Sequence, residues 1–218
     1  MRSVSNKWAK TAVLQKKQDV ALHLPPMRPY GLSGLGKMLD LYGRVVAKPV
    51  KGSGGGGVLF VGRRGQGYYL KNGRKVRHYR SLAALRGGID RLRRGRKYFL
   101  QRWISLAEIR GRPVDYRVKL VKEGSAWRLK ALVGRMASPG LSVTNLAQGG
   151  VQLRGADAIR RSLPSIRAVT KKREMTRLAY TCTRLMEEAF PGIGALGYDF
   201  GLDRSGRIWI LEVNTRPR

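Results

Sequence analysis

The sequence contains few acidic residues, one cysteine and two histidines. Of its 218 residues, 13 are Asp or Glu and 45 are Lys or Arg, which gives a net charge of +32 and a pI of about 11.5. The single cysteine, Cys182, excludes an internal disulfide framework and fits a reducing compartment. The histidines, His23 and His78, lie far apart and lack metal-ligand spacing, so we expect no histidine metal site.

The sequence also lacks a run of about 18 apolar residues that could span a bilayer, and no hydrophobic segment follows residues 1–7. We therefore expect a cytoplasmic protein with no cleaved signal and no membrane partner. A hydrophobic fraction of 42% is enough for the core of one large domain or two small lobes. The positive charge predicts attraction to a polyanionic partner, because basic side chains release counterions when they bind one.

The most informative stretch, residues 197–214, predicts a β-hairpin around the polar turn at residues 203–206. An even-numbered turn would place Asp199 opposite Ile210, on the same face as Glu212 and Asn214. Asp199 and Glu212 would then lie on a diagonal of about 7–8 Å. Two carboxylates and an amide oxygen are ligands that suit Mg²⁺. The hairpin therefore predicts a magnesium site, and an ordinary solvated polar face is the alternative interpretation.

A glycine run between two strands is the second informative stretch. It follows Lys48 and consists of Gly52, Ser53, Gly54, Gly55, Gly56 and Gly57. Glycines let backbone N–H groups approach a phosphate closely, so the run predicts a hairpin loop over nucleotide phosphates, with Lys48 reaching in from the preceding strand. The Gly-Lys-Ser/Thr ending and the following helix of a Walker A loop are missing. A flexible surface loop is the alternative.

The rest of the chain predicts alternating helices and hairpins. Residues 6–18 predict a helix with Trp8, Ala12 and Val13 at helical spacing, and three prolines in residues 24–29 predict an extended connector. We expect further helices and strands in the following ranges: helices 33–42, 81–95 and 171–190; strands 44–50, 68–70, 76–79, 97–104, 113–121 and 126–135. Residues 138–150 predict a loop near a site.

Taken together, the order of these stretches resembles an ATP-grasp protein. The similarity rests on Lys48 before the glycine loop, residues 99–104, residues 115–118, Asn145 with Gly149-Gly150, and Asp199 with residues 212–214. Within that superfamily, residues 6–8, 48–50 and 143–146 are most similar to the YheC/YheD group, which is associated with endospore coats.

The resemblance implies an α+β fold in which two lobes clamp a nucleotide. Residues 1–102 would form the N-terminal lobe with the glycine-rich phosphate loop, and residues 103–218 the C-terminal lobe with the magnesium hairpin. We expect the domain that usually precedes the first lobe in ATP-grasp ligases to be absent from this chain. Association with a spore is a further expectation for its location.

The resemblance also implies roles for individual residues. Lys48 would contact the ATP phosphates, and Gly52, Ser53, Gly54, Gly55, Gly56 and Gly57 would close over them. Gln101, Arg102, Trp103 and Ile104 would bind the adenine, Glu108 the ribose, and Asn145 would belong to the same nucleotide site. Arg117 and Arg135 would neutralise the transferred phosphoryl group, and Asp199, Glu212 and Asn214 would hold one or two Mg²⁺ ions. Gly197 departs from the pattern, because many ligases have an arginine there.

Three classes of function follow. The first is an ATP- and Mg²⁺-dependent carboxylate–amine ligase that acts through an acyl phosphate on small-molecule or peptide substrates, or a phosphotransferase that uses the same clamp. The second is a nucleotide-binding structural protein of a spore coat without catalysis. The third is a basic nucleic-acid-binding protein, which the charge of +32 favours but the scattered distribution of basic residues does not.

Overall fold

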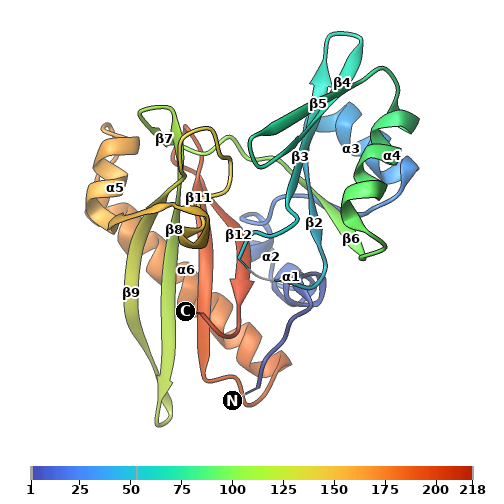
Figure 1. Cartoon of the computed structure of the whole chain (residues 1–218). Helices are drawn as coiled ribbons and strands as arrows, with labels where there is room; N and C mark the ends of the chain where they lie inside the picture. Colours follow the sequence, from blue (N-terminus) through green and yellow to red (C-terminus); the bar gives the residue numbers. More distant parts are fainter. Residues whose placement is uncertain (1, 53, 218) are drawn as a thin grey trace. The chain divides into compact units, whose positions relative to one another are not determined.

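The structure is a computed structural model that describes residues 2–52 and 54–217 (Figure 1). The chain divides into two compact units: unit 1 contains the residues up to Leu24 and those from Ile104 onward, and unit 2 contains Pro25–Trp103. The sequence analysis placed residues 1–102 in one lobe. The structure instead joins the opening helices to unit 1, because Leu14 and Val20 are buried in the core of that unit.

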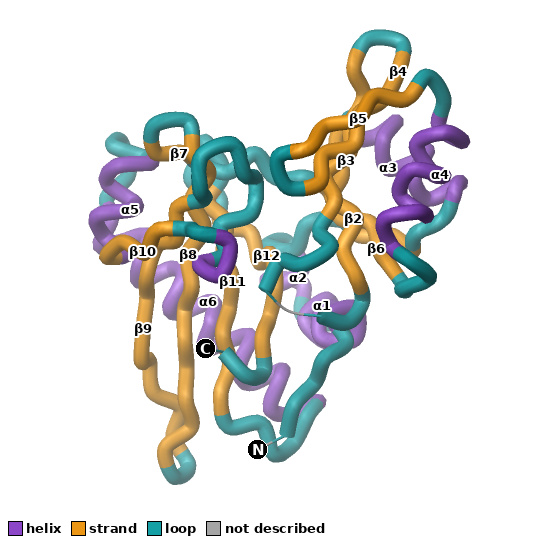
Figure 2. The backbone as a smooth tube through the Cα atoms, viewed as in Figure 1, coloured by secondary structure: helices purple, strands orange, loops and turns teal. Residues whose placement is uncertain are grey.

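Unit 2 is an antiparallel sheet with two helices on one face (Figure 2). Its strands follow the order β1-β6-β2-β3-β4-β5. Leu35 and Leu39 of α3 and Leu85 and Ile89 of α4 share a buried core with inward-facing residues of the sheet. The bounds are β1 Met27–Pro29, α3 Leu32–Tyr42, β2 Arg44–Pro49, β3 Leu59–Arg64, β4 Gly67–Asn72, β5 Lys75–Tyr79, α4 Leu82–Arg93 and β6 Tyr98–Arg102.

Unit 1 is a second antiparallel sheet, in the order β10-β9-β8-β11-β12, and β7 pairs with β8. Figure 1 shows α6 running across the back of this sheet, where Met175, Ala179, Cys182 and Met186 pack on its apolar face. The bounds are α1 Lys7–Gln15, α2 Gln18–Ala21, β7 Glu108–Ile109, β8 Arg112–Glu123, β9 Ala126–Met136, η1 Leu146–Gln148, β10 Val151–Arg154, α5 Gly155–Ser162, α6 Ala168–Ala189, β11 Ala195–Leu202 and β12 Ile208–Asn214.

Alternation along β8 separates the two faces of the unit 1 sheet, as the sequence predicts. Val114, Tyr116, Val118 and Leu120 are fully buried in the core that the helices cover, so the intervening residues point to the opposite face. The burial of Cys182 in this core raises the pKa of its thiol to about 12, which suits a structural rather than a reactive cysteine. None of the helices in residues 2–52 and 54–217 is both long enough and apolar enough to cross a bilayer.

Candidate functional site

The predicted hairpin is present in unit 1, but its register differs from the prediction. Asp199 pairs directly with Glu212, and Phe200 pairs with Ile210, because a β-bulge lies between these two pairs. Ile210 is therefore buried on the core face and does not share a face with Glu212, as the regular hairpin of the sequence analysis required. The direct pairing replaces the expected diagonal between Asp199 and Glu212.

The bulge keeps the three predicted metal ligands on one face. Asn214 pairs with Gly197, which lies two residues before Asp199 and so points to the same side of β11. Asn214 Nδ2 donates to Asp199 Oδ2 at 3.4 Å. A Cβ at Gly197 would lie 2.6 Å from Pro217 and 3.4 Å from the Arg117 side chain, so the space that an arginine would need at this position is already filled.

Two arginines from neighbouring strands bind the Asp199 carboxylate. Arg117 of β8 pairs across the strands with Asp199 and donates from Nε and Nη2, the latter at 3.1 Å from Oδ2. Arg135 of β9 places its Nη2 3.1 Å from Asp199 Oδ1. Although burial alone would raise the pKa of Asp199, the guanidinium groups of Arg135 and Arg117 hold it below its usual range. Asp199 is therefore ionised, as a cation ligand must be.

Arg135 also binds a second buried carboxylate, Asp115 of β8. Its Nε donates to Asp115 Oδ1 at 2.8 Å, and both side chains are less than a tenth exposed. Thr144, from the loop at residues 138–150, adds a hydrogen bond to Asp115. We call Asp115, Arg117, Arg135 and Asp199 the charged network. Because its members lie on three neighbouring strands, β9, β8 and β11, and bind one another, their positions are fixed before any ligand arrives.

Two lysines of α1 extend the site, and the sequence analysis did not identify them. Lys7 Nζ lies 3.4 Å from Glu212 Oε1, and both Lys7 and Lys10 are buried. Burial and the nearby Lys7 lower the pKa of Lys10, Glu212 and Asp199 raise it, and the net result is a pKa of about 8. The helix expected over residues 6–18 is present as α1, Lys7–Gln15. It buries Lys7, Lys10 and Leu14, while Val13 is partly buried against the core and Ala12 is exposed.

The residues on this face fit a magnesium ion. They offer the carboxylates of Asp199 and Glu212 and the amide oxygen of Asn214, while the amide nitrogen of Asn214 faces Asp199. Within residues 2–52 and 54–217, His, Cys, Asp and Glu do not form a group of three that could hold a metal ion, so a magnesium site on this face would need the amide oxygen of Asn214 as a third ligand. Hard oxygen donors of limited number suit Mg²⁺, which usually retains water and takes further oxygens from phosphates.

Among the predicted phosphate and adenine residues of unit 2, Lys48 and Gln101 lie on the sheet face away from α3 and α4. Arg102 pairs with Val45 of the core and its guanidinium lies 5.2 Å from the ring of Tyr42 in α3, so it lies on the helix-covered face. Val46 pairs with Phe60 on one side and with Gln101 on the other, and Lys48 follows two residues later on the same face. Lys71, which pairs with Phe60, joins this face, and burial lowers its pKa. The sequence analysis missed Lys71, because its position became apparent only from the pairing of β3 with β4.

The four residues predicted to bind adenine lie on both sides of the boundary between the units. Gln101 and Arg102 end β6, and the ring of Trp103 lies 4.8 Å from that of Phe60, with the Arg44 guanidinium 5.1 Å from the Trp103 ring. Ile104 is buried and begins the second segment of unit 1. The predicted strand 97–104 therefore ends two residues early.

Two further predicted residues lie in unit 1. Glu108 is exposed on the short strand β7. The Asn145 side chain accepts a hydrogen bond from the Ala147 amide at 2.8 Å and caps η1, so it stabilises the loop that supplies Thr144 to the charged network. This local bond gives Asn145 a structural role in addition to the predicted contact with the nucleotide.

The glycine run forms the loop between β2 and β3. Gly52, Gly54, Gly55 and Gly57 all have positive φ, a conformation that residues with a Cβ rarely adopt. At its end the loop is anchored by the Tyr98 hydroxyl, which donates to the Gly57 carbonyl at 2.6 Å. Gly56 lies in the same turn, and Ser53 lies outside the described residues. The Tyr98 hydroxyl thus fixes the end of the loop, and the shape of the loop depends on its backbone conformation rather than on side chains of its own.

Comparisons with known proteins bear on this arrangement. The model of the YheC/D-like ATP-grasp family matches residues 2–218. The endospore coat-associated protein YheD of Bacillus subtilis (strain 168) is 24% identical over 221 residues, which cover 97% of this chain and 48% of YheD. YheC of the same organism is 21% identical over 222 residues, which cover 99% of this chain and 61% of YheC. The chain thus spans about half the length of YheD and somewhat more of YheC.

Solved structures of ligases and synthases have the same fold. Carboxyaminoimidazole ribonucleotide synthase from Aspergillus clavatus, complexed with ATP, has a TM-score of 0.62 at 14% identity over 100% of this chain and 46% of the enzyme. The D-alanyl-alanine synthetase A of Vibrio cholerae scores 0.56 at 14% identity, over 97% and 55%. The L-amino acid ligase of Bacillus licheniformis scores 0.57 at 15% identity, over 97% and 40%. These similarities establish an ATP-grasp fold.

Proposed function

Because the chain belongs to the YheC/D-like ATP-grasp family, we propose that it is an ATP- and Mg²⁺-dependent ligase that joins a carboxylate to an amine. The solved structures of similar fold include ATP-dependent ligases, which supports this class of reaction. The substrates we propose are small molecules or peptides that carry these two groups.

One observation supports the proposal: the face of the unit 1 sheet away from α6 combines oxygen donors with fixed positive charge. Asp199, Glu212 and Asn214 supply oxygen donors, and Arg117 and Arg135 lie against Asp199 from the neighbouring strands. Preorganised charge of this kind accelerates phosphoryl transfer, because the reaction needs positioning and charge neutralisation rather than a protein nucleophile. The alternative interpretation, an ordinary solvated polar face, does not explain why these carboxylates have buried basic partners.

The charge balance of this face suits an anionic substrate. Four buried or half-buried basic side chains face three carboxylates: Lys7, Lys10, Arg117 and Arg135 against Asp115, Asp199 and Glu212. The surplus of positive charge would attract the phosphates of ATP and the carboxylate substrate. Asp199, Glu212 and Asn214 would hold the Mg²⁺, which would supply further charge neutralisation at the phosphates.

Some residues of the chain would bind ATP, and others would neutralise charge during the reaction. Lys48 and the glycine loop would hold the phosphates of ATP, and Gln101, Arg102 and Trp103 would bind the adenine. Arg117 and Arg135 would neutralise the terminal phosphoryl group as it passes from ADP to an oxygen of the substrate carboxylate. The amine would then attack the carbonyl carbon of this acyl phosphate, lose a proton and release phosphate, which forms the amide.

Calorimetry with ATP tests the metal site. We expect Glu212→Gln to weaken ATP binding at least tenfold when Mg²⁺ is present and to leave binding in EDTA unchanged. Glu188→Gln, which removes the same charge from an exposed position at the end of α6, is the matched control and should change neither value. Equal affinity of wild type and Glu212→Gln in the presence of Mg²⁺ would refute the assignment of Glu212 as a cation ligand.

A second function is favoured by the names of the relatives, both of which are endospore coat-associated proteins. In this alternative the chain binds ATP as part of a coat assembly and does not catalyse a ligation. Release of ADP that depends on both a carboxylate and an amine supports the ligase. Binding of Mg²⁺ and ATP without ADP release across a broad panel of both substrates supports the structural protein.

A further inference from the structure

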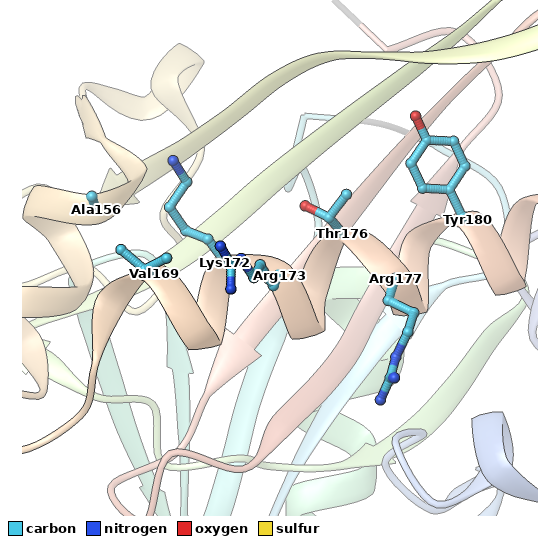
Figure 3. Close-up of a pocket in the computed structure, with 7 residues that line it drawn as sticks. All are labelled: Ala156, Val169, Lys172, Arg173, Thr176, Arg177 and Tyr180. Carbon is cyan, nitrogen blue, oxygen red and sulfur yellow. The ribbon is translucent and has the colours of Figure 1, made fainter.

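A basic groove lies along α6, on the side of the unit 1 sheet opposite to the charged network (Figure 3). It has a volume of about 570 Å³ and is lined chiefly by Val169, Lys172, Arg173, Thr176, Arg177 and Tyr180. We call it the α6 groove. Lys172, Thr176 and Tyr180 follow one another at intervals of four residues, so they form one continuous stripe along the helix.

The α6 groove lies within a segment whose charged residues are mostly basic. Residues 155–184 contain eight Lys or Arg and two acidic residues. Both acidic residues form ion pairs with basic residues outside the groove: Asp157 pairs with Arg160, and Glu174 pairs with Lys171. Within the described parts of the chain, neither Lys172, Arg173 nor Arg177 forms an ion pair with a carboxylate. Basic side chains gathered without counter-charges indicate an external anion.

The spacing of these cations fits a chain of anions rather than a single one. Arg173 and Arg177 are one turn apart, which corresponds to about 6 Å along the helix axis, and Arg184 continues the exposed line two turns beyond Arg177. Guanidinium groups arranged in a line contact successive phosphates of one strand, whereas a single small anion would engage only one or two of them.

An aromatic ring completes the groove. Tyr180 is half-buried against the core and leaves part of its ring in the groove. A positively charged groove combined with an aromatic side chain is the arrangement by which proteins hold single-stranded nucleic acid, since bases stack on the ring while the backbone follows the charges. A membrane surface is a poorer fit, because the apolar stripe of α6 is buried against the sheet and is unable to enter a bilayer.

We propose that the α6 groove binds single-stranded nucleic acid, with Lys172, Arg173 and Arg177 on the phosphates and Tyr180 stacked against a base. This inference does not depend on the ligase activity, because the groove and the charged network lie on opposite faces of the unit 1 sheet. It assigns a location to the polyanionic partner that the charge of +32 predicts.

Fluorescence anisotropy with a labelled oligothymidylate of 20 nucleotides tests the proposal in the full chain, with saturating ATP and Mg²⁺ present to occupy the nucleotide site. We expect Arg173→Gln/Arg177→Gln to weaken binding at least tenfold at low salt. Because each lost phosphate contact lowers the slope of log affinity against log salt by about 0.7, the slope should fall by about 1.4.

A matched double variant separates the groove from the general positive charge. Arg64→Gln/Arg204→Gln removes the same charge from exposed positions elsewhere and should weaken binding less than threefold. Equal losses in the two double variants would overturn the proposal, since the affinity would then come from net charge alone. The absence of measurable oligonucleotide binding by the wild type would overturn it as well.

The aromatic contact has its own test. Tyr180→Leu should weaken oligothymidylate binding about 5- to 100-fold, and Tyr180→Phe, which keeps the ring, should remain within about twofold of the wild type. Thermal unfolding of both variants shows whether each is folded. Duplex DNA, polyglutamate or anionic vesicles that compete as well as the oligonucleotide would contradict single-stranded nucleic acid as the ligand and assign the surface to another polyanion.

Discussion

The candidate residues of the two units are held in place in different ways. In unit 1, Asp115, Arg117, Arg135 and Asp199 bind one another through side chains on paired strands. In unit 2, the glycine loop is defined by backbone conformation and by one anchoring hydroxyl, that of Tyr98. The first arrangement fixes charges in advance, and the second leaves a segment able to change shape.

This difference corresponds to two requirements of phosphoryl transfer. Stabilisation of developing charge is strongest when the charged groups do not need to reorganise during the reaction, which the charged network provides. Binding and release of a triphosphate require a segment that adapts to it, which glycines in positive φ provide. The comparison therefore predicts that side-chain substitutions disturb the charged network most, and that substitutions of glycine disturb the glycine loop most.

The largest effect is expected for Arg135→Met. It removes the shared counter-charge of Asp115 and Asp199 and leaves a buried carboxylate uncompensated, so the free energy of unfolding should fall by about 3–5 kcal/mol. Urea unfolding followed by tryptophan fluorescence measures this loss. The control is Arg128→Met, an exposed arginine of the same strand, which should change stability by less than about 0.5 kcal/mol. A loss below about 1 kcal/mol for Arg135→Met would show that the charged network does not hold unit 1 together.

A smaller effect is expected for Gly57→Ala in unit 2. The new Cβ would meet the Tyr98 hydroxyl at 2.7 Å and Arg96 Nη2 at 2.8 Å, at a φ of +76°. We expect a loss of stability of about 2–3 kcal/mol from backbone strain and overpacking together. Gly54→Ala has a similar φ of +71° but nothing within 4 Å of its Cβ, so it should lose only about 1 kcal/mol. Calorimetric unfolding of the two variants measures the difference. Equal losses of stability would show that the Tyr98 side chain moves away from the new Cβ at little cost.

The sequence predicted the parts of the fold and site that depend on local pattern. Alternation in β8 placed Asp115 and Arg117 on one face, and the glycine run is found as a loop between two strands, in which Gly52 and Gly57 have positive φ. The ATP-grasp fold and the YheC/D family were predicted from the order of the motifs and are confirmed. The site roles assigned to individual residues remain predictions.

Non-local packing explains what the sequence did not predict. The bulge between Asp199 and Phe200 is set by pairing with two neighbouring strands, and a regular period of two gives no sign of it. Lysines are expected on the exposed side of a helix, so Lys7 and Lys10 did not suggest burial; their position follows from Glu212 on a distant strand. The strand pairing that places Lys71 beside Phe60 is equally invisible in the local pattern.

A third prediction asks whether fixed polar contacts in unit 1 extend to the turn of the hairpin. Asp203 accepts hydrogen bonds from the Ser205 hydroxyl at 2.6 Å and from the Trp209 indole at 2.8 Å, as well as from backbone amides. Burial raises the pKa of Asp203, but these hydrogen bonds together hold it below its usual range. Asp203→Asn should therefore reduce stability by about 1 kcal/mol at pH 7.

The pH dependence gives the sign of this effect. A carboxyl group with a depressed folded pKa stabilises the protein fully above its unfolded pKa of about 3.9, and the contribution is lost as the pH falls through the folded value. The difference between wild type and Asp203→Asn should thus be constant from pH 5 to pH 7 and shrink below about pH 4, as measured by urea unfolding at each pH. A difference that grows on acidification would contradict the role of the ionised carboxylate.

The smallest effect is expected for Lys122→Met. This variant tests whether an ion pair of unit 1 must be buried to contribute strongly to the free energy of unfolding. Lys122 binds Glu187 at a position where about a third of each side chain is exposed, and Trp127 Nε1 donates to the same carboxylate at 2.9 Å. Because solvent and salt screen such pairs, the free energy of unfolding should fall by about 0.2–1 kcal/mol and the loss should shrink further in 1 M salt. Urea unfolding at two salt concentrations measures both values. A loss near that of Arg135→Met would mean that an ion pair of unit 1 does not need to be buried to stabilise the protein strongly.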